Sequence, residues 1–249
     1  MIDTCIVIPC YNEEKRMETL KEEYVSFLEN NSETTICFVD DGSKDNTLNV
    51  LLDFKNKQPN NIKIIPLKNN QGKAEAVRRG MVYCSENVNS KYISFLDADL
   101  STSLQECLRL KQILINNIDV CFVFGSRIAK VGSTIEIDYF RFLVGRIIAT
   151  FISKILQLKV YDTQCGCKVF KGDIVPQLFK ESFTSKWLFD VELFFRMYKL
   201  YGKKEAVAKM KEVPLDSWID PGGSKVSFTY FFRLWIDLYK IKSRYLQYR

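Results

Sequence analysis

Apolar and polar positions alternate in blocks through the first half of the chain. Short runs rich in β-branched and aromatic residues predict strands, and longer segments with apolar residues every three or four positions predict helices. This alternation is typical of parallel βαβ units with helices on both faces of the sheet. The expected strands cover residues 4–9, 35–39, 62–67, 92–96 and 120–125, and the expected helices cover residues 13–29, 45–55, 72–84 and 104–116.

The pattern changes near residue 130. We expect a loop over residues 129–136 and a helix over residues 138–158, with a broad apolar stripe that arginine and lysine residues interrupt. A second basic and aromatic stripe near the end of the chain predicts another helix. Such amphipathic helices either lie in a membrane interface or pack on the rest of the fold, and the pattern leaves both open. The second stripe consists of Phe228, Phe231, Phe232, Trp235, Leu238 and Tyr239.

The composition is that of an ordinary globular protein. With 249 residues, 47% hydrophobic and 27% charged, the chain can bury a sizeable core, and disorder and coiled coil are disfavoured. No uncharged apolar run approaches the roughly 18 residues of a spanning helix. A strand-like pattern begins almost at the first residue, so we expect no signal peptide.

The net charge of +6 is unevenly distributed along the chain. Residues 196–249 carry 12 basic and 5 acidic side chains, which indicates an anionic partner such as a phosphate group or an anionic membrane surface. A solvated basic surface explains the same charges. Nucleic acid is disfavoured as a partner, because no recognised nucleic-acid-binding motif accompanies the basic segment.

Histidine is absent, which excludes imidazole bases, Ser–His and Cys–His nucleophiles and histidine-ligated zinc. The eight cysteines contain no C-x-x-C pair. Three of them, Cys5, Cys37 and Cys121, lie in apolar strand-like runs, where cysteine usually acts as a small buried hydrophobe. We therefore expect free thiols and a reducing cytoplasm. Chemistry near neutral pH must come from carboxylates, lysine, tyrosine, cysteine or a metal ion held by oxygen ligands.

Two carboxylates, Asp97 and Asp99, stand one residue apart at the end of the fourth expected strand. They repel each other unless a cation lies beside them. Mg²⁺ and Mn²⁺ prefer such oxygen ligands, and Mg²⁺ often shares them with substrate phosphates. A D-x-D sequence alone is weak evidence, because many are turn or capping residues. A second acidic turn after a neighbouring strand, residues 40–43 (DDGS), favours the metal site, since ligands of open α/β sheets bind beyond the carboxyl ends of the strands.

Two further turns carry candidate binding groups. Asp40 or Asp41 can accept hydrogen bonds from a nucleoside base or ribose, although the same turn can simply cap the next helix. Gly72 and Lys73 open a helix after a glycine turn, an arrangement suited to cradle a phosphate. The chain has neither a P-loop nor a G-x-G-x-x-G motif, which disfavours a dinucleotide cofactor.

Four motifs stand in order in the first half of the chain: residues 9–14 (PCYNEE), 39–43 (VDDGS), 70–81 (NQGKAEAVRRGM) and 97–100 (DADL). The second half contains residues 124–127 (FGSR), 162–170 (DTQCGCKVF), 187–192 (WLFDVE) and 223–225 (GSK). The first-half motifs together resemble the family 2 glycosyltransferases. The second-half segments resemble the dolichyl- or polyprenyl-phosphate sugar synthase branch of that family, most of all the dolichyl-phosphate glucosyltransferases.

The resemblance implies a GT-A fold, which is α/β and Rossmann-like: a mostly parallel central sheet with helices on both faces, followed here by C-terminal amphipathic helices. It implies one glycosyltransferase domain over residues 1–225, with a nucleotide-sugar half at residues 1–127 and an acceptor half at residues 128–225. A basic amphipathic helix at residues 226–249 follows. We expect the protein to be cytoplasmic and peripheral on the cytoplasmic face of the membrane.

By the same resemblance, Asp97 and Asp99 bind Mg²⁺ or Mn²⁺ and the donor diphosphate, and Arg127 and Lys168 meet an acceptor phosphate. Asp190 lines the sugar site, although its position also suits the polar first turn of a helix. The residues implied to bind the nucleotide sugar are Pro9, Tyr11, Asn12, Glu13, Asp40, Asp41, Gly72, Lys73, Asp97, Ala98, Ser224 and Lys225.

The reaction implied is inverting transfer of a hexose, with glucose favoured, from a nucleotide diphosphate sugar, with UDP-glucose favoured, to a polyprenyl or dolichyl phosphate. The alternative acceptor is a sugar hydroxyl of a surface polysaccharide or glycolipid. A lipid phosphate is already anionic at pH 7, whereas a hydroxyl needs a carboxylate base, for which Asp190 is the candidate. A non-catalytic module that binds anionic membranes or nucleic acid is the third hypothesis.

Overall fold

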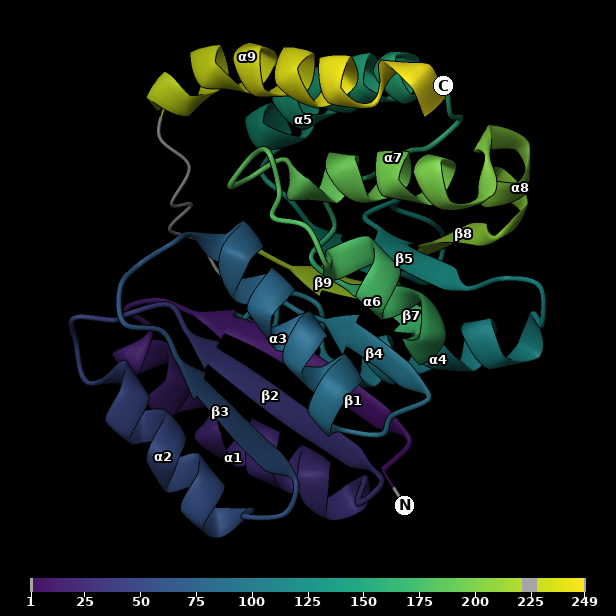
Figure 1. Ribbon diagram of the computed structural model, residues 1–249. Coiled ribbons are helices and arrows are strands. Elements are labelled where there is room, and N and C mark those ends of the chain that lie inside the picture. The colour runs from purple at the N-terminus through teal and green to yellow at the C-terminus, as the bar shows by residue number, and fades with distance from the viewer. Residues whose placement is uncertain (1, 221–227, 249) are drawn as a thin grey trace. The chain divides into compact units, whose positions relative to one another are not determined.

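The computed structural model describes residues 2–220 and 228–248, and the chain divides into two compact units (Figure 1). Unit 1 comprises Met1–Leu100 and Cys167–Ser182, and unit 2 comprises Ser101–Gly166 and Phe183–Arg249. Each unit has its own strands, helices and core. Ser224 and Lys225, two of the expected donor-binding residues, lie outside the described residues.

The strands of unit 1 form a sheet in the order β3-β2-β1-β4-β7, in which β1 to β4 are parallel and β7 is antiparallel to β4. The strands are β1 (Thr4–Cys10), β2 (Thr34–Asp40), β3 (Ile62–Pro66), β4 (Tyr92–Phe95) and β7 (Lys168–Lys171). The helices are α1 (Glu14–Asn30), α2 (Thr47–Lys57), α3 (Lys73–Asn87), the short 3₁₀ helix η1 (Gly172–Ile174) and α6 (Val175–Phe179).

Helices cover both faces of this sheet (Figure 1). On one face, Phe38 of β2 packs edge-on against Tyr24 of α1 and Phe54 of α2. The next residue along β2, Val39, points to the opposite face, as alternation in a strand requires. There α3 approaches so closely that a Cβ on Gly80 would overlap a methyl group of Val7. The expected α/β architecture, a mostly parallel sheet covered on both sides, is confirmed.

Unit 2 is built around long helices and two short strand pairs. Phe122 and Phe124 of the first pair pack against Phe194 of a buried helix, and this aromatic cluster forms part of the core. The parallel pairs are β5 (Phe122–Ser126) with β8 (Met210–Pro214), and β6 (Thr134–Glu136) with β9 (Ser217–Ile219). The helices are α4 (Leu104–Asn116), α5 (Tyr139–Leu156), α7 (Phe189–Tyr201), α8 (Lys203–Ala208), α9 (Phe228–Arg244) and the short η2 (Leu246–Tyr248).

The helices expected at residues 138–158 and at the end of the chain are present as α5 and α9. The loop expected over residues 129–136 was wrong in part, because residues 134–136 pair with β9 as strand β6. The structure describes the backbone of Phe228, Phe231 and Phe232, and their side chains are outside what it describes. Among residues 2–220 and 228–248, no helix combines the length and the apolar character needed to span a bilayer.

Candidate active site

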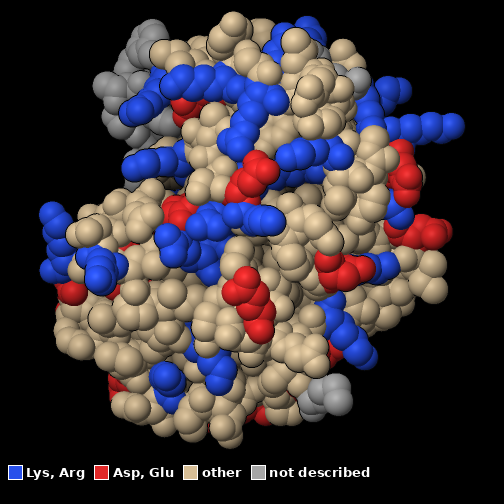
Figure 2. All heavy atoms as spheres, viewed as in Figure 1, with Lys and Arg blue, Asp and Glu red and all other residues tan. Residues whose placement is uncertain are grey.

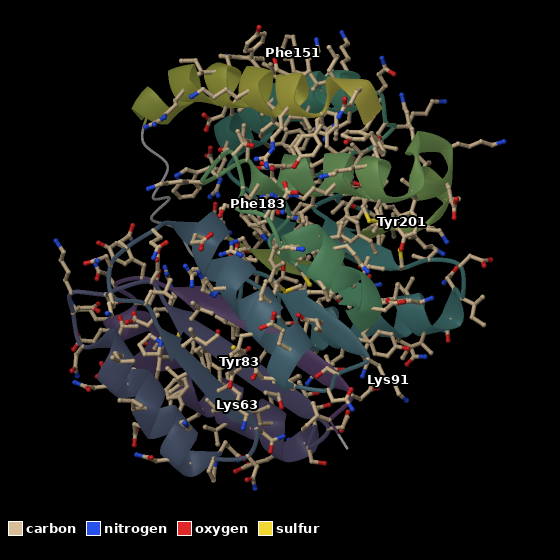
Figure 3. All side chains as sticks on the ribbon, in the orientation of Figure 1. Lys63, Tyr83, Lys91, Phe151, Phe183 and Tyr201 are labelled. Carbon is tan, nitrogen blue, oxygen red and sulfur yellow. The ribbon has the colours of Figure 1, made fainter. Side chains whose placement is uncertain are left out.

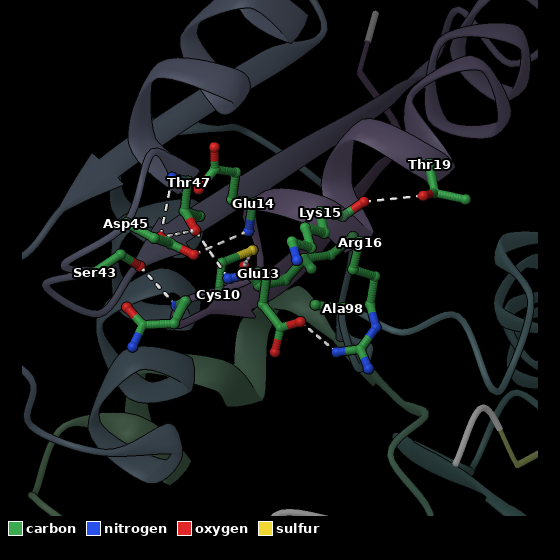
Figure 4. A network of polar contacts seen from close by, with 12 residues as sticks. Cys10, Glu13, Glu14, Lys15, Arg16, Thr19, Ser43, Asp45, Thr47 and Ala98 are labelled. Carbon is green, nitrogen blue, oxygen red and sulfur yellow. Dashed lines mark hydrogen bonds and ion pairs between the residues drawn. The ribbon is translucent and has the colours of Figure 1, made fainter. Parts of the chain in front are cut away.

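The loops that follow β1 and β2 brace each other in unit 1 (Figure 4). Asn12 has a left-handed backbone (φ +52°), and its backbone N–H donates to the Ser43 hydroxyl at 3.0 Å. Its side-chain oxygen accepts the N–H of Lys44 at 2.8 Å. The N–H of Glu13 donates to the Thr47 hydroxyl at 2.8 Å. These hydrogen bonds hold the loop after β1 in one shape. Asn12 suits that shape because asparagine tolerates positive φ better than most residues.

The starts of α1 and α2 also satisfy each other. The N–H of Glu14 donates to the Asp45 carboxylate at 3.2 Å, and the N–H of Asn46 donates to the Glu14 carboxylate at 3.2 Å. Burial opposes ionisation of Asp45, but hydrogen bonds from Thr47 and Glu14 outweigh it and lower the pKa of that carboxyl. Asp45 also accepts the N–H of Thr47, the first residue of α2, at 3.1 Å. Pro9 lies on β1 opposite Val39 of β2. Tyr11 comes directly after β1 and is half-buried.

Asp41 ties the second motif to the glycine turn. It is almost fully buried, and its two carboxylate oxygens accept the N–H groups of Gln71 and Gly72, each at 2.8 Å. Its neighbour Asp40, also buried, accepts the N–H of Ser43 at 3.2 Å. Asp41 thus orders the turn from which Lys73 and helix α3 start.

The acidic pair follows β4, at the carboxyl end of the parallel strands. The Lys73 ammonium lies 2.5 Å from a carboxylate oxygen of Asp97, and both side chains are about one-third exposed. Asp99 is partly exposed, and Leu100 after it has a left-handed backbone (φ +50°). Between the two acids, the Ala98 carbonyl accepts the buried Tyr24 hydroxyl at 3.3 Å. Lys73, from a turn far away in sequence, therefore meets the acidic pair as a counter-charge.

This donor set fits a hard divalent ion only in part. Two carboxylates offer oxygen ligands that Mg²⁺ and Mn²⁺ accept. No group of three or more acidic or cysteine side chains able to hold a metal exists within the described ranges 2–220 and 228–248. An ion at Asp97 and Asp99 would therefore take its remaining ligands from substrate phosphates and water, as Mg²⁺ commonly does.

Arg127 leaves the end of β5 in unit 2 already paired. Its guanidinium makes two hydrogen bonds to the Asp162 carboxylate, at 2.6 and 3.0 Å, and its backbone N–H makes a third at 3.2 Å. The guanidinium also lies 5.4 Å from the centre of the Trp218 ring. Burial opposes ionisation of Asp162, but Arg127 lowers the pKa of that carboxyl below its usual range.

A second arginine shares the Trp218 ring. The Arg141 guanidinium, at the start of α5, lies 6.0 Å from the same ring centre and pairs with Asp220. The sequence pattern showed Arg141 only as a charge beside an apolar stripe. The positions of Arg127 and Arg141 in the sequence do not indicate that they share a ring. They come together only at Trp218 of β9, and the position of that strand depends on contacts between residues far apart in the sequence.

Lys168 and Asp190 are both buried, each within its own unit. Lys168, on β7, has no exposed surface, and its ammonium lies 5.3 Å from the Phe95 ring. Asp190 is 6% exposed and stands in the first turn of α7, the place that the sequence offered as an alternative to a sugar-binding role. Neither role excludes the other, and the assignments of Lys168, Asp190 and Arg127 stay predictions.

The mostly parallel sheet with helices on both faces has solved counterparts among GT-A glycosyltransferases. Glucosyl-3-phosphoglycerate synthase from Mycobacterium tuberculosis, solved with Mn²⁺, UDP-glucose and phosphoglyceric acid, shares this fold at a TM-score of 0.70 and 14% identity, over 97% of this chain and 80% of that one. The match to the family model "Glycosyl transferase family 2" spans residues 5–179. The chain belongs to glycosyl transferase family 2 and is a glycosyltransferase.

Similarity to named relatives extends over nearly the whole of this chain. The dolichyl-phosphate beta-glucosyltransferase of Dictyostelium discoideum is 30% identical over 253 residues, covering 97% of this chain and 74% of the relative. The proteins of the same name from Saccharomyces cerevisiae and Homo sapiens are 30% and 29% identical, and each match covers 97% of this chain. The resemblance found in the motifs of the sequence is thereby confirmed.

Proposed function

We propose that the protein transfers glucose from UDP-glucose to a dolichyl or polyprenyl phosphate, with inversion at the sugar and with a divalent metal ion. The observation that carries the acceptor is the similarity to dolichyl-phosphate beta-glucosyltransferases, which extends over 97% of the chain rather than over the family domain alone. The donor and metal rest on the acidic pair and on the solved structure that holds Mn²⁺ and UDP-glucose.

Unit 1 carries the donor chemistry in this proposal. Asp97 and Asp99 would hold the divalent ion, which would supply positive charge beside the leaving diphosphate. Lys73, already 2.5 Å from Asp97, is placed to add a further positive charge beside that diphosphate. The braced turns at Asn12 and Asp41 hold the base and ribose, because they are ordered by backbone hydrogen bonds before any donor binds. Preordered groups lose little freedom on binding.

Unit 2 carries cations for the acceptor phosphate. A phosphate monoester has a second pKa near 6, so it is anionic at pH 7 and needs charge to hold it rather than a base. A guanidinium carries more N–H donors than one carboxylate can accept, so Arg127 can bind a phosphate while it keeps its pair with Asp162. Arg141 on the same indole ring adds a second charge. By resemblance, Lys168 is assigned to an acceptor phosphate and Asp190 to the transferred sugar.

The lipid acceptor also predicts where the protein meets a membrane. Helices α5 and α9 touch through Phe151 and Trp235, whose rings pack edge-on with centres 4.9 Å apart. Figure 3 shows Phe151 beside α9, and Figure 2 shows lysine and arginine side chains on this part of unit 2. We propose that this face lies on an anionic, cytoplasmic membrane surface. Its exposed apolar side chains are Tyr139, Phe142, Leu143, Ile147, Phe151, Trp235, Ile236 and Tyr239.

The test is a transfer assay with labelled UDP-glucose and either Mg²⁺ or Mn²⁺, run with a short polyprenyl phosphate, with the matching polyprenol, and with a free oligosaccharide. We expect labelled product only with the phosphate. Transfer to the oligosaccharide with none to polyprenyl phosphate would contradict the proposal and favour a hydroxyl acceptor. The polyprenol is the matched control, because it has the same chain and lacks the anion.

A further inference from the structure

Glu192 is a buried carboxylate two residues beyond Asp190, in the same first turn of α7. Its side chain has no exposed surface, and it accepts the N–H of Thr184 at 2.7 Å and the guanidinium of Arg196 at 3.0 Å. The hydroxyl of Tyr245, which follows α9, donates to it at 2.9 Å. Three separate segments therefore meet at one carboxylate of the turn that also carries Asp190.

A second contact joins α9 to the start of α7. The Ser185 hydroxyl donates to the Asp237 carboxylate of α9 at 2.7 Å. The same hydroxyl oxygen accepts the N–H groups of Trp187 and Leu188, at 3.3 and 3.1 Å. The first N–H groups of a helix have no partner within the helix, so a side chain that binds those just before it fixes how the helix begins. Ser185 thus links α9 to the turn that carries Asp190.

Helix α9 divides into two faces. Residues that pack inward recur every three or four positions, as they do on one side of a helix. The face that meets α7 therefore lies opposite the face that is open to solvent. Its buried residues are Leu234, Asp237, Leu238 and Ile241, followed by Tyr245 just beyond the helix. On the face open to solvent, the exposed apolar residues among the described side chains are Trp235, Ile236 and Tyr239.

These contacts hold the turn firmly. A buried carboxylate is costly unless it is fully hydrogen-bonded, so the Glu192 turn cannot shift without losing several bonds at once. Burial, together with the charge of Glu192, raises the pKa of Tyr245 to about 12, so its hydroxyl stays a donor. The Tyr245 ring is also stacked on Phe195 of α7, with ring centres 5.7 Å apart.

We propose that Glu192, Ser185 and Asp237 are positioning residues for Asp190, through which helix α9 sets the geometry of the transfer step. The inference rests on the proposed function, since it takes Asp190 to touch the transferred sugar. Helix α9 then positions an active-site turn in addition to packing on the rest of unit 2. The helix whose outer face is proposed to meet the membrane also fixes the acidic turn of α7 from its inner face.

The experiment measures kcat for polyprenyl phosphate and KM for UDP-glucose in Ser185→Ala and Tyr245→Phe. Each substitution removes one hydroxyl, and Tyr245→Phe keeps the ring that stacks on Phe195. We expect kcat to fall roughly 10- to 100-fold with little change in KM, because a small misplacement of a group that orients the substrate costs that much. Ser185→Thr keeps a hydroxyl and should recover most of the loss.

The control for α9 is Ser243→Ala, an exposed uncharged position on the same helix, which should leave kcat unchanged. A double-mutant cycle with Asp190→Asn separates positioning from general loosening. If Ser185 acts through Asp190, Ser185→Ala should cost almost nothing further once the Asp190 carboxylate is gone.

Two results would overturn the inference: wild-type kcat in both hydroxyl variants, or a loss of equal size with and without the Asp190 carboxylate. Failure of the proposed function looks different, because wild-type protein would then give no product with polyprenyl phosphate. If a sugar hydroxyl is the acceptor instead, the same cycle on that acceptor decides the inference.

Discussion

Units 1 and 2 hold their candidate functional residues in different ways. In unit 1 the groups come from turns at the ends of parallel strands, and backbone N–H groups and left-handed residues such as Asn12 and Leu100 shape them. In unit 2 the groups are charged side chains whose partners lie far along the chain, as Arg127 and Asp162 do. The first kind of site depends on local conformation, and the second depends on buried charge balance.

The difference predicts different failures. A substitution at a unit 1 turn should change donor binding or catalysis with a modest change in stability. A substitution in a unit 2 ion pair should change stability and acceptor use together, because it leaves the remaining charged group buried without its counter-charge. Four substitutions test this contrast, beginning with the largest expected effect.

Asp99→Asn should have the largest effect. It removes one of the two carboxylates assigned to the metal ion, and loss of one charge-stabilising group in an active site typically lowers the rate by about 10³-fold. Because Asp99 is partly exposed, the thermal midpoint should hardly move. The measurement is kcat with saturating Mn²⁺, with exposed Asp119→Asn as the control. Wild-type turnover in Asp99→Asn would contradict the assignment.

Arg127→Ala should come next and should affect both stability and acceptor use. Removing one partner of the pair leaves the Asp162 carboxylate buried without its counter-charge, which should lower the free energy of unfolding by about 3 kcal/mol. Turnover of polyprenyl phosphate should be lost, while UDP binds as it does to wild type. Urea unfolding measures the stability, the transfer assay measures turnover, and titration calorimetry measures UDP binding.

The control for Arg127→Ala is Lys130→Ala, which removes an exposed pair with Asp216 and should change neither quantity measurably. Unchanged transfer to polyprenyl phosphate in Arg127→Ala would show that this cation does not hold the acceptor.

Gly42→Ala should have a smaller effect, on the donor side alone. Gly42 has φ +66°, and a Cβ there would lie 2.6 Å from the carbonyl carbon of Asn69. The conformation costs about 1–2 kcal/mol, and the contact should displace the glycine turn and raise KM for UDP-glucose. Gly132→Ala is the matched control, because Gly132 has φ +85° with nothing within 4 Å of its Cβ position. Equal KM values in the two variants would contradict the predicted contact.

The smallest effect concerns pH. Burial, with a contribution from Asp162, raises the pKa of Glu212, although backbone N–H groups of Tyr161 and Asp162 oppose this. A carboxyl with a raised folded-state pKa favours the folded state at low pH, and its contribution is lost as pH rises above its unfolded value of about 4.3. Asp162, with its pKa lowered, contributes in the opposite sense and loses its contribution as pH falls.

Glu212→Gln should therefore gain stability relative to wild type as pH rises from about 4.5, the region just above the ordinary glutamate pKa. Urea midpoints measured across this range in wild type and Glu212→Gln test the sign. A steeper decline in the variant would show that the Glu212 carboxyl is not the group responsible.

Much of unit 1 could be predicted from the sequence because its signals are local. The alternation of β1 to β4 with α1 to α3 follows apolar runs and helix periodicity, and the acidic pair falls directly after one such run. Strand β7 was missed because Lys168–Lys171 (KVFK) is four residues long, with a lysine at each end. The complete burial of Lys168 depends on its antiparallel pairing with β4, which local sequence does not encode.

In unit 2 the long helices were predictable and the partners of the charged residues were not. Helix α4 has the expected bounds, whereas Met210–Pro214 (MKEVP) and Ser217–Ile219 lack a clear strand pattern. Because the sequence does not predict those strands, it does not indicate that the Arg127 guanidinium lies over the Trp218 ring or that Glu212 accepts the N–H of Asp162. Glu192 lies in the polar first turn that the sequence predicts around Asp190, but local sequence gives no signal for its burial against Tyr245.

The most direct test of the central claim is a crystal of the protein soaked with UDP and Mn²⁺ and measured for anomalous scattering. The account predicts a manganese peak within coordination distance of the Asp97 and Asp99 carboxylates, with diphosphate oxygens completing its shell. A manganese ion bound elsewhere, with UDP in place and the acidic pair uninvolved, would contradict it.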